Sequence, residues 1–195
     1  MKESATMTDT ATDGDRGKVL LALARAAIAR EFGSAREFGS ECASAAWLHE
    51  PGACFVTLTQ NGQLRGCIGS LEPRRALLLD VESNARAAAF SDPRFEPLAP
   101  AELARTDIEI SLLSPMQPLA FADEADALAQ LRPGIDGVVF ECGHHRSTFL
   151  PQVWEQLPEP RAFLAHLKNK ARLPANFWSD DVRLSRYTVS KWKER

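Results

Sequence analysis

Apolar residues recur at helical spacing in four stretches of the chain. Residues 18–31 carry them at about every third or fourth position and stop before Gly33, which predicts an amphipathic helix ended by a glycine. Residues 74–91 repeat the pattern and end at an Asp-Pro pair, because a proline disfavours helix in the residue before it. Residues 124–131 predict a short helix, and residues 160–172 predict a longer one with a proline in its first turn.

Strand patterns lie between these helices. Residues 53–60 and 63–70 are β-prone runs joined by Asn61-Gly62. Both positions of a two-residue type I′ turn need positive φ, which Asn and Gly tolerate, so we predict a hairpin here. Residues 107–113 alternate apolar and polar side chains, which predicts a strand with one apolar face.

The remaining strand patterns set the fold class. Residues 137–141 and 146–150 predict a second hairpin across a Cys-Gly-His-His turn, and residues 182–192 predict an extended segment. Hairpins and helices follow one another without a regular βαβ alternation. This order favours an α+β fold with a mainly antiparallel or mixed sheet and flanking helices.

Composition then narrows the class of protein. The chain is 45% hydrophobic and 25% charged, which is ordinary globular composition and excludes a collagenous or wholly disordered protein. No apolar run approaches the roughly 18–20 residues that span a bilayer, and the N-terminal residues lack the apolar region of a secretory signal. Four cysteines without a Cys-x-x-Cys pair are typical of free thiols in a reducing cytosol. We therefore expect a cytoplasmic protein without a membrane partner.

Charge is distributed unevenly. Residues 1–15 contain one base and four acids and carry the whole net charge of −3. We expect residues 1–16 to form a disordered acidic tail before one domain at 17–195. A hexapeptide repeat over residues 30–41 is too short for a solenoid and predicts a loop. Residues 161–195 hold nine Lys and Arg against three acids, but the rest of the domain compensates them, which favours a solvated surface over a nucleic-acid interface.

The Asn-Gly turn also predicts which residues of the first hairpin face one another. With a two-residue loop, opposed residue numbers sum to 123, so Cys67 opposes Val56 and Arg65 opposes Leu58. Opposed residues share one face of a sheet. We therefore expect Arg65 and Cys67 on the same face, together with Cys54.

The pairing of an arginine with a cysteine has a specific chemical meaning. A guanidinium near a thiol stabilises the thiolate and increases its nucleophilic fraction. Gly66 and Gly69 flank Cys67, and glycines in a strand suit a close approach to backbone amides. The alternative is a buried, structural cysteine whose neighbouring glycines make room for a helix.

Two further positions have the residue types of a binding or catalytic site. Arg94 follows the predicted helix end at Asp92-Pro93 and either clamps a carboxylate or phosphate or pairs with Asp92 as a structural staple. Glu109 lies on the predicted strand 107–113. It either holds an arginine, acts as a general base, or lies on a solvated face.

Cofactor and metal signals are weak. Cys142, His144 and His145 share the predicted turn, but a structural zinc site usually needs four ligands with recognisable spacing. Exposed turn histidines are the better interpretation, and we expect no metal. The sequence contains neither a dinucleotide fingerprint nor a P-loop, so we expect no nucleotide cofactor, and it lacks the Gly-x-Ser-x-Gly elbow of hydrolases.

Several ordered blocks resemble the AMMECR-type domain. They are LRGCIG at 64–69, NARAAAFSDPRF at 84–95, EIS at 109–111 and FLPQVW at 149–154. The C-terminal run through Lys168, Phe177-Trp178, Arg186-Tyr187 and Lys191-Trp192 resembles the bacterial branch of this family, AmmeMemoRadiSam system protein A. The resemblance covers about residues 18–193.

This resemblance implies a two-lobed α+β domain with the cysteine motif near a cleft. It implies a Memo-like protein and a radical S-adenosylmethionine enzyme as partners, but no reaction, so it leaves open whether the protein is an enzyme. Our hypothesis is a cleft in which Cys67 is the thiolate and Glu109 a second catalytic group. The positions that would bind a small anionic substrate are Arg65, Gly66, Gly69, Asp92 and Arg94.

Two alternatives remain. The first is a non-catalytic adaptor or peptide-binding module in which Cys67 is structural. The second and weaker one is a nucleic-acid-associated protein that uses the basic C-terminal residues. The cleft hypothesis predicts a structure in which Arg94 and Glu109 converge on Cys67 in a concave pocket.

Overall fold

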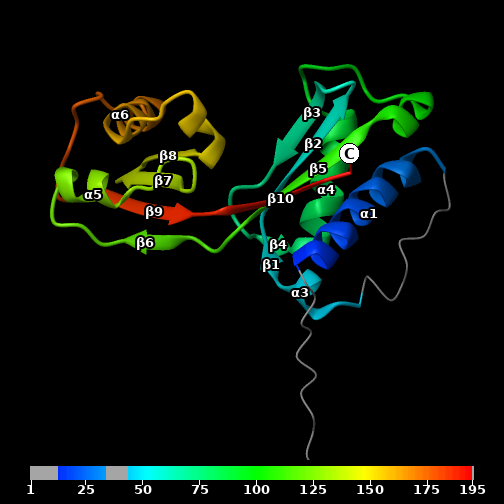
Figure 1. Cartoon of the computed structure of the whole chain (residues 1–195), viewed down its shortest axis with the longest axis horizontal. Helices are drawn as coiled ribbons and strands as arrows, with labels where there is room; N and C mark the ends of the chain where they lie inside the picture. Colours follow the sequence, from blue (N-terminus) through cyan, green and yellow to red (C-terminus); the bar gives the residue numbers. More distant parts are fainter. Residues whose placement is uncertain (1–12, 34–43, 195) are drawn as a thin grey trace, which may run out of the picture. The chain divides into compact units, whose positions relative to one another are not determined.

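The computed structural model describes residues 13–33 and 44–194, which form two compact units (Figure 1). The first unit lies within residues 1–112 and 191–195, and the second comprises residues 113–190. Each contains helices and an antiparallel sheet, which confirms the predicted α+β class. Among the helices described, none is long and apolar enough to cross a membrane.

The first unit is built on a four-stranded sheet with the order β10-β5-β2-β3. Its main elements are α1 Asp13–Glu31, β2 Cys54–Gln60, β3 Gln63–Gly69, α4 Leu77–Phe90, β5 Asp107–Leu113 and β10 Val189–Lys193. The smaller ones, which the sequence patterns did not predict, are α3 Ala46–His49, β1 Pro51–Gly52, β4 Arg75–Ala76 and the 3-10 helix η1 Pro100–Arg105. Helices α1 and α4 pack on one face of the sheet (Figure 1). We call this the inner face and the opposite one the outer face.

Helix α1 confirms the first predicted helix and extends it. Its apolar side, which includes Leu20 and Ile28, is completely buried. The helix extends N-terminally past the predicted residue 18 to Asp13, the first residue of the described range. Residues 13–16, predicted as the end of the disordered acidic tail, therefore lie in helix α1. The rest of that tail and most of the hexapeptide repeat lie outside the described residues.

Trp192 and Glu194 connect helix α1 to the sheet of the first unit. Trp192 of β10 lies against Gly17 of α1, where a Cβ atom would come within 2.3 Å of the indole ring. Glu194 accepts hydrogen bonds from Arg25 Nε at 2.6 Å, from Arg25 Nη2, and from the backbone N–H of Ile108 at 2.9 Å. One carboxylate therefore ties α1 to β5.

The first hairpin has the predicted turn. Asn61 and Gly62 have φ values of 51° and 77°, as a type I′ turn requires. The pairs Gln60–Gln63 and Thr59–Leu64 also follow the predicted register.

Beyond these two pairs the predicted register is wrong. A β-bulge inserts Arg65 as an extra residue, so Leu58 opposes Gly66 and Cys67 opposes Thr57 instead of Val56. One added residue shifts every following side chain to the other face of the sheet. Cys67 therefore lies on the outer face, whereas Val56 is completely buried on the inner face.

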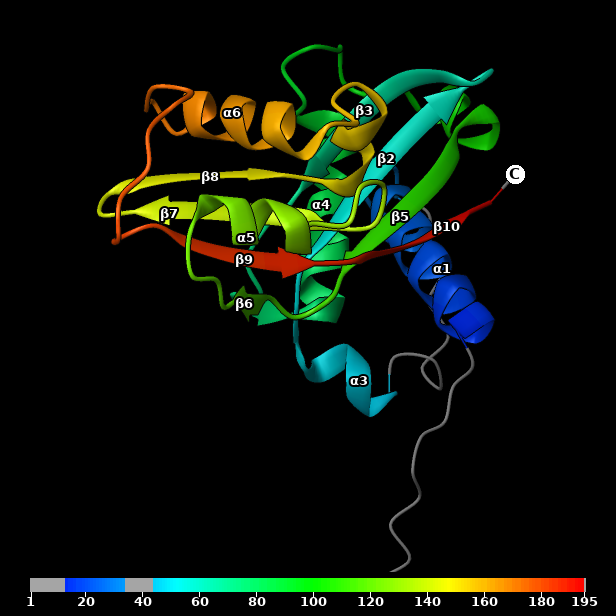
Figure 2. The ribbon, with the colours of Figure 1, turned by 60° about the vertical axis from the view of Figure 1, so that its left-hand side comes forward.

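The second unit is a four-stranded antiparallel sheet with the order β6-β9-β7-β8 (Figure 2). Its elements are β6 Gln117–Leu119, α5 Glu124–Gln130, β7 Gly137–Cys142, β8 His145–Phe149, the 3-10 helix η2 Pro151–Glu155, α6 Pro160–Lys170 and β9 Arg183–Tyr187. Phe140, Phe163 and Leu184 lie in its core. The structure confirms the predicted second hairpin, formed by β7 and β8, and the two predicted helices, α5 and α6. The segment predicted as extended over 182–192 contributes to β9 and β10.

Candidate functional site

A row of three side chains crosses the outer face of the first sheet. Cys67 of β3 opposes Thr57 of β2, and Thr57 opposes Glu109 of β5. Opposed residues point to the same side of a sheet, so the fold places Cys67 and Glu109 on one face, as the cleft hypothesis requires. Two strand spacings separate their α-carbons by about 10 Å.

The cysteine sulfur has a defined hydrogen-bond donor. The Thr57 hydroxyl donates to Cys67 Sγ at 3.3 Å. Cys67 directs its backbone N–H away from β2, to a side chain beyond the sheet edge, so this is a non-hydrogen-bonded strand pair, in which opposed side chains come closest. Thr57 was not among the predicted site residues, because the predicted register placed it on the other face.

Asp92 and Arg94 bind the main chain of Cys67. The buried carboxylate of Asp92 accepts the Cys67 N–H at 2.8 Å, and Arg94 Nη2 donates to the Cys67 carbonyl at 3.3 Å. Arg94 also donates to Asp92 through Nε at 2.9 Å and Nη2 at 2.6 Å. This geometry matches the structural-staple alternative for the Asp92–Arg94 pair, although half of the Arg94 side chain remains exposed.

The charge of Asp92 is stabilised by these contacts. The hydrogen bonds from Arg94, aided by the Cys67 N–H, hold the pKa of Asp92 well below its ordinary value and outweigh the effect of burial. The ion pair also raises the pKa of Arg94. Cys67 thus lies on an edge strand, and its two backbone groups that point away from the sheet are bound by the Asp92 carboxylate and the Arg94 guanidinium.

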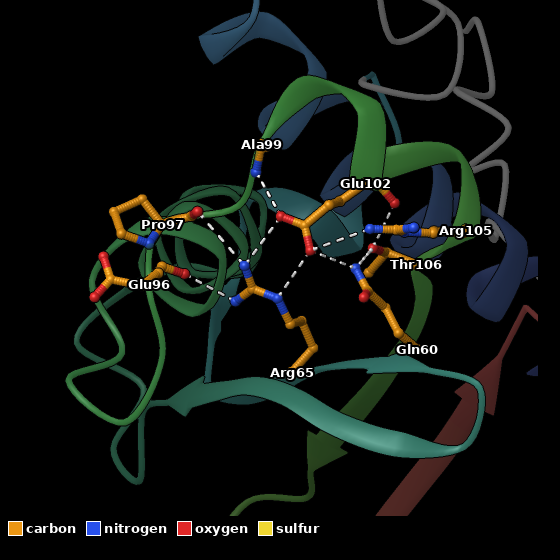
Figure 3. Close-up of polar contacts among 8 residues, drawn as sticks. All are labelled: Gln60, Arg65, Glu96, Pro97, Ala99, Glu102, Arg105 and Thr106. Carbon is orange, nitrogen blue, oxygen red and sulfur yellow. Dashed lines mark hydrogen bonds and ion pairs between the residues drawn. The ribbon is translucent and has the colours of Figure 1, made fainter.

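Arg65 is turned toward a different partner from the one predicted. Figure 3 shows its guanidinium bound to Glu102, with Nε to Oε1 at 3.3 Å and Nη2 to Oε2 at 3.1 Å. It also donates to the carbonyl of Glu96 at 2.9 Å. Gln60, an inner-face residue like Leu58, donates from Nε2 to Glu102 Oε1, the oxygen that also accepts from Arg65 Nε. The expectation that Arg65 shares a face with Cys67 and stabilises its thiolate is therefore wrong, because the bulge turns Arg65 to the side of Gln60.

Glu102 is the acceptor at the centre of the Arg65 contacts. Besides Arg65 it accepts the backbone N–H of Ala99 at 2.8 Å (Figure 3). Together these bonds, with Arg65 first, lower the pKa of Glu102 to about 2. No sequence motif points to Glu102, because its role depends on a 3-10 helix that periodicity did not predict.

The two glycines of the motif make room for neighbouring side chains and helices. A Cβ atom on Gly66 would lie 2.1 Å from the Ala88 carbonyl oxygen on α4, and one on Gly69 would lie 2.2 Å from the Phe55 ring. The alternative that a neighbouring helix requires the glycine is thus correct for Gly66. Gly66 is buried on the inner face, so the expectation that it opens backbone amides beside Cys67 is wrong.

The other described cysteines have different surroundings. Cys54 is buried on the inner face beside Asp80, its backbone N–H donating to Asp80 Oδ2 at 3.0 Å, and burial raises the pKa of its thiol. The expectation that Cys54 shares a face with Cys67 is wrong for the same register reason. Cys142 Sγ lies 3.6 Å from Ser179 Oγ, and His145 Nδ1 lies 2.8 Å from the Ala171 carbonyl. Residues 13–33 and 44–194 contain no cluster of three metal-binding side chains.

Comparison with known proteins identifies the family. The family model AMMECR1 matches residues 21–192, which span both units. The chain belongs to the AMMECR1 family.

Relatives of this chain are found in archaea. A protein of Methanothermobacter thermautotrophicus is 34% identical over 92% of this chain and 95% of its own length. A protein of Aeropyrum pernix is 35% identical over 93% of this chain and 80% of its own length. The crystal structure of an uncharacterised protein from Pyrococcus horikoshii is similar with a TM-score of 0.75 and 30% identity, over 92% of this chain and 91% of that one.

Proposed function

We propose that Cys67 is the reactive group of this protein and that it acts as a thiolate nucleophile toward a small substrate. The observation that carries the proposal is the hydrogen bond from Thr57 to Cys67 Sγ on a strand whose backbone is fixed by Asp92 and Arg94. A donor aimed at sulfur favours its charged form. A rigid strand is also a better support for a reactive group than a loop.

The neighbouring groups have roles in this proposal. Arg94, half exposed beside Cys67, orients an anionic substrate with the part of its guanidinium that faces solvent. Glu109 accepts a proton through the substrate or a water molecule, since its α-carbon is about 10 Å from that of Cys67. Arg65 is not part of the proposed site, because its guanidinium is paired with Glu102. A concave pocket that joins Cys67, Arg94 and Glu109 stays a prediction.

The partners and the location are part of the same proposal. We propose that the protein acts in the cytoplasm with a Memo-like protein and a radical S-adenosylmethionine enzyme. The support for these partners is the resemblance of the C-terminal residues to the bacterial branch of the family. The relatives described above, in contrast, are archaeal.

Peptide-resolved alkylation tests the proposed thiolate. We expect iodoacetamide at pH 7 to label Cys67 faster than Cys42, Cys54 and Cys142. Thr57→Val removes the hydroxyl and should slow labelling of Cys67 by about tenfold, the size of one hydrogen bond to a charged group. Thr57→Ser keeps a hydroxyl and should retain most of the rate. Equal rates in the wild type and Thr57→Val would contradict the proposal.

A second candidate function is a non-catalytic adaptor. It is favoured by the ion pairs Arg65–Glu102 and Arg94–Asp92, which leave both candidate anion-binding arginines neutralised by a carboxylate. The activity of the partner enzymes in the presence of Cys67→Ser distinguishes the two, with co-purification as the control that the variant still binds. An adaptor should support the activity of the partner enzymes equally well with Cys67→Ser, whereas a nucleophile should bind them and lose activity.

The nucleic-acid alternative is the weakest. Among the basic residues of 161–195, Lys168 is buried against Glu124 and is withdrawn from any phosphate-binding surface. We expect no affinity for RNA or DNA tighter than about 10 μM at physiological salt, which is weaker than specific nucleic-acid complexes. A salt-sensitive, submicromolar affinity in a fluorescence-anisotropy titration would show that this expectation is wrong.

A further inference from the structure

The row of side chains on the outer face of the first sheet continues onto β10, the strand beside β5 (Figure 1). Two backbone hydrogen bonds fix how these strands pair. The N–H of Glu194 donates to the Ile108 carbonyl at 3.1 Å, and the N–H of Ser114 donates to the Thr188 carbonyl at 2.9 Å. The two bonds are equally spaced along both strands, so the strands are antiparallel and no bulge shifts their register.

This register places Lys193 of β10 opposite Glu109 of β5. The neighbouring Trp192 lies against Gly17 of α1 on the inner face, and successive side chains of a strand point to opposite faces. Lys193 is therefore on the outer face. Each strand of the sheet contributes one side chain to a single row, in the order Cys67, Thr57, Glu109 and Lys193.

Lys193 is a cation without a carboxylate bound to it. It is exposed, and within residues 13–33 and 44–194 it forms neither an ion pair nor a side-chain hydrogen bond. Arg94, beyond the edge of β3, has its charge offset by Asp92. An anion on this face therefore finds a less neutralised partner in Lys193 than in Arg94.

The spacing of the row sets the length of a ligand that spans it. Three strand spacings of about 4.8 Å separate the α-carbons of Cys67 and Lys193 by about 14 Å. Side chains stand roughly perpendicular to a sheet, so their ends are separated by a similar distance. The carboxylate of Glu109 lies between them, where it repels an anion and accepts a hydrogen bond from an N–H group.

We propose that Lys193 binds the anionic end of an extended substrate whose reactive carbon lies at Cys67, with about 10–14 Å between the two. The inference rests on the proposed function of Cys67 and names the class of its substrate. That class is a peptide-like molecule with an electrophilic carbon at one end, N–H groups in the middle and a carboxylate at the other end.

Iodoacetylated glycine peptides measure the distance between the cysteine and the cation. The Cys67 sulfur displaces iodide and bonds to the acetyl carbon, so the probe is anchored at one end. An extended residue spans about 3.3–3.6 Å, so iodoacetyl-triglycine brings its carboxylate near Lys193 and iodoacetyl-glycine does not. Each probe is compared with the same molecule ending in a neutral amide, by peptide-resolved mass spectrometry of the full chain.

The comparison is made at pH 9 and low salt. At this pH an ordinary thiol is largely ionised and lysine keeps its charge, so labelling does not require a specially stabilised thiolate. We expect the carboxylate form of iodoacetyl-triglycine to label Cys67 about two- to fivefold faster than the amide form, the size of an exposed ion pair. The glycine probe should show no such preference, and neither should the partly exposed Cys142 of the second unit.

Variants of the chain assign the preference to one lysine. Lys193→Gln should abolish it, and Lys193→Arg should retain it because the positive charge is kept. Lys18→Gln is the matched control, since it removes an exposed lysine of α1 in the same unit, and it should leave the preference unchanged.

Four results would overturn the inference. They are the absence of a preference in the wild type, its survival in Lys193→Gln, an equal loss in Lys18→Gln, and failure of both triglycine probes to label Cys67. An equal change of both probe rates in Lys193→Gln would also overturn it, because Lys193 would then act only through Glu109. Slow labelling at pH 7 with the preference intact at pH 9 would instead contradict the proposed thiolate alone.

Discussion

Asp92 and Cys67 are joined across 25 residues of sequence, because the buried carboxylate of Asp92 accepts the backbone N–H of Cys67 at 2.8 Å. Arg94 completes the contact at the Cys67 carbonyl. The two side chains occupy the backbone groups that an edge strand otherwise leaves open. Residues 92–94, the Asp-Pro-Arg sequence after α4, therefore bind the open edge of β3 at Cys67.

Removing the charge of Asp92 should destabilise the protein. We expect Asp92→Asn to lower the free energy of unfolding by about 1–2 kcal/mol, since it weakens charge-assisted hydrogen bonds to a buried group. Glu72→Gln is a matched control, because Glu72 and Arg74 form an exposed ion pair with the same spacing in sequence; its effect should stay below about 0.5 kcal/mol. Urea denaturation measures both, and equal values would count against the role of Asp92.

The lowered pKa of Glu102 predicts loss of stability in acid. Its pKa is about 2 in the folded protein against an ordinary value of 4.5, so the unfolded chain binds the proton more readily. The contribution of Glu102 to the free energy of unfolding is fully present above pH 4.5 and is lost as the pH falls toward 2. Glu102→Gln should flatten the stability–pH curve in this range. An unchanged curve, measured by urea denaturation between pH 5 and 2, would refute the assignment.

Gly66 should not tolerate a side chain. Gly66→Ala would place a Cβ atom 2.1 Å from a backbone oxygen of α4, and we expect a loss of about 1–3 kcal/mol from overpacking. Gly14→Ala is the control, because nothing lies within 4 Å of a Cβ at that helical position; it should stabilise the protein by up to about 1 kcal/mol. Thermal unfolding of both variants measures the difference, and similar melting temperatures would disprove the close approach.

Local sequence patterns were sufficient for most elements of the fold. The type I′ turn was predictable because Asn61 and Gly62 carry the conformational requirement themselves. The strand 107–113 was predicted at its observed bounds, since the alternation of apolar and polar residues is contained within seven residues. The start of α1 was missed because the first turn holds acidic and small residues without an apolar stripe.

The bulge at Arg65 could not be predicted from the hairpin sequence. Its extra residue is held by Glu102, which lies 37 residues away in a 3-10 helix without a periodic signature. This one residue decides which face Cys67 occupies. The strand register therefore places Cys67 and Glu109 on one face, as the cleft hypothesis requires, and contradicts the predicted placement of Arg65 and Gly66, which depends on contacts distant in sequence. The catalytic roles of Cys67 and Glu109 stay a prediction.

The contact between Arg25 and Glu194 spans 169 residues and sets an order of events during synthesis. A ribosome releases α1 long before it reaches residue 194. Until then the first sheet lacks β10, and Arg25 lacks the carboxylate that ties its helix to β5. The second unit has no such requirement, because its residues 113–190 are contiguous in sequence. Helix α1 is thus synthesised early but gains its last partner late, and until residue 194 is added Arg25 has the backbone carbonyls of Leu103 and Thr106 as acceptors.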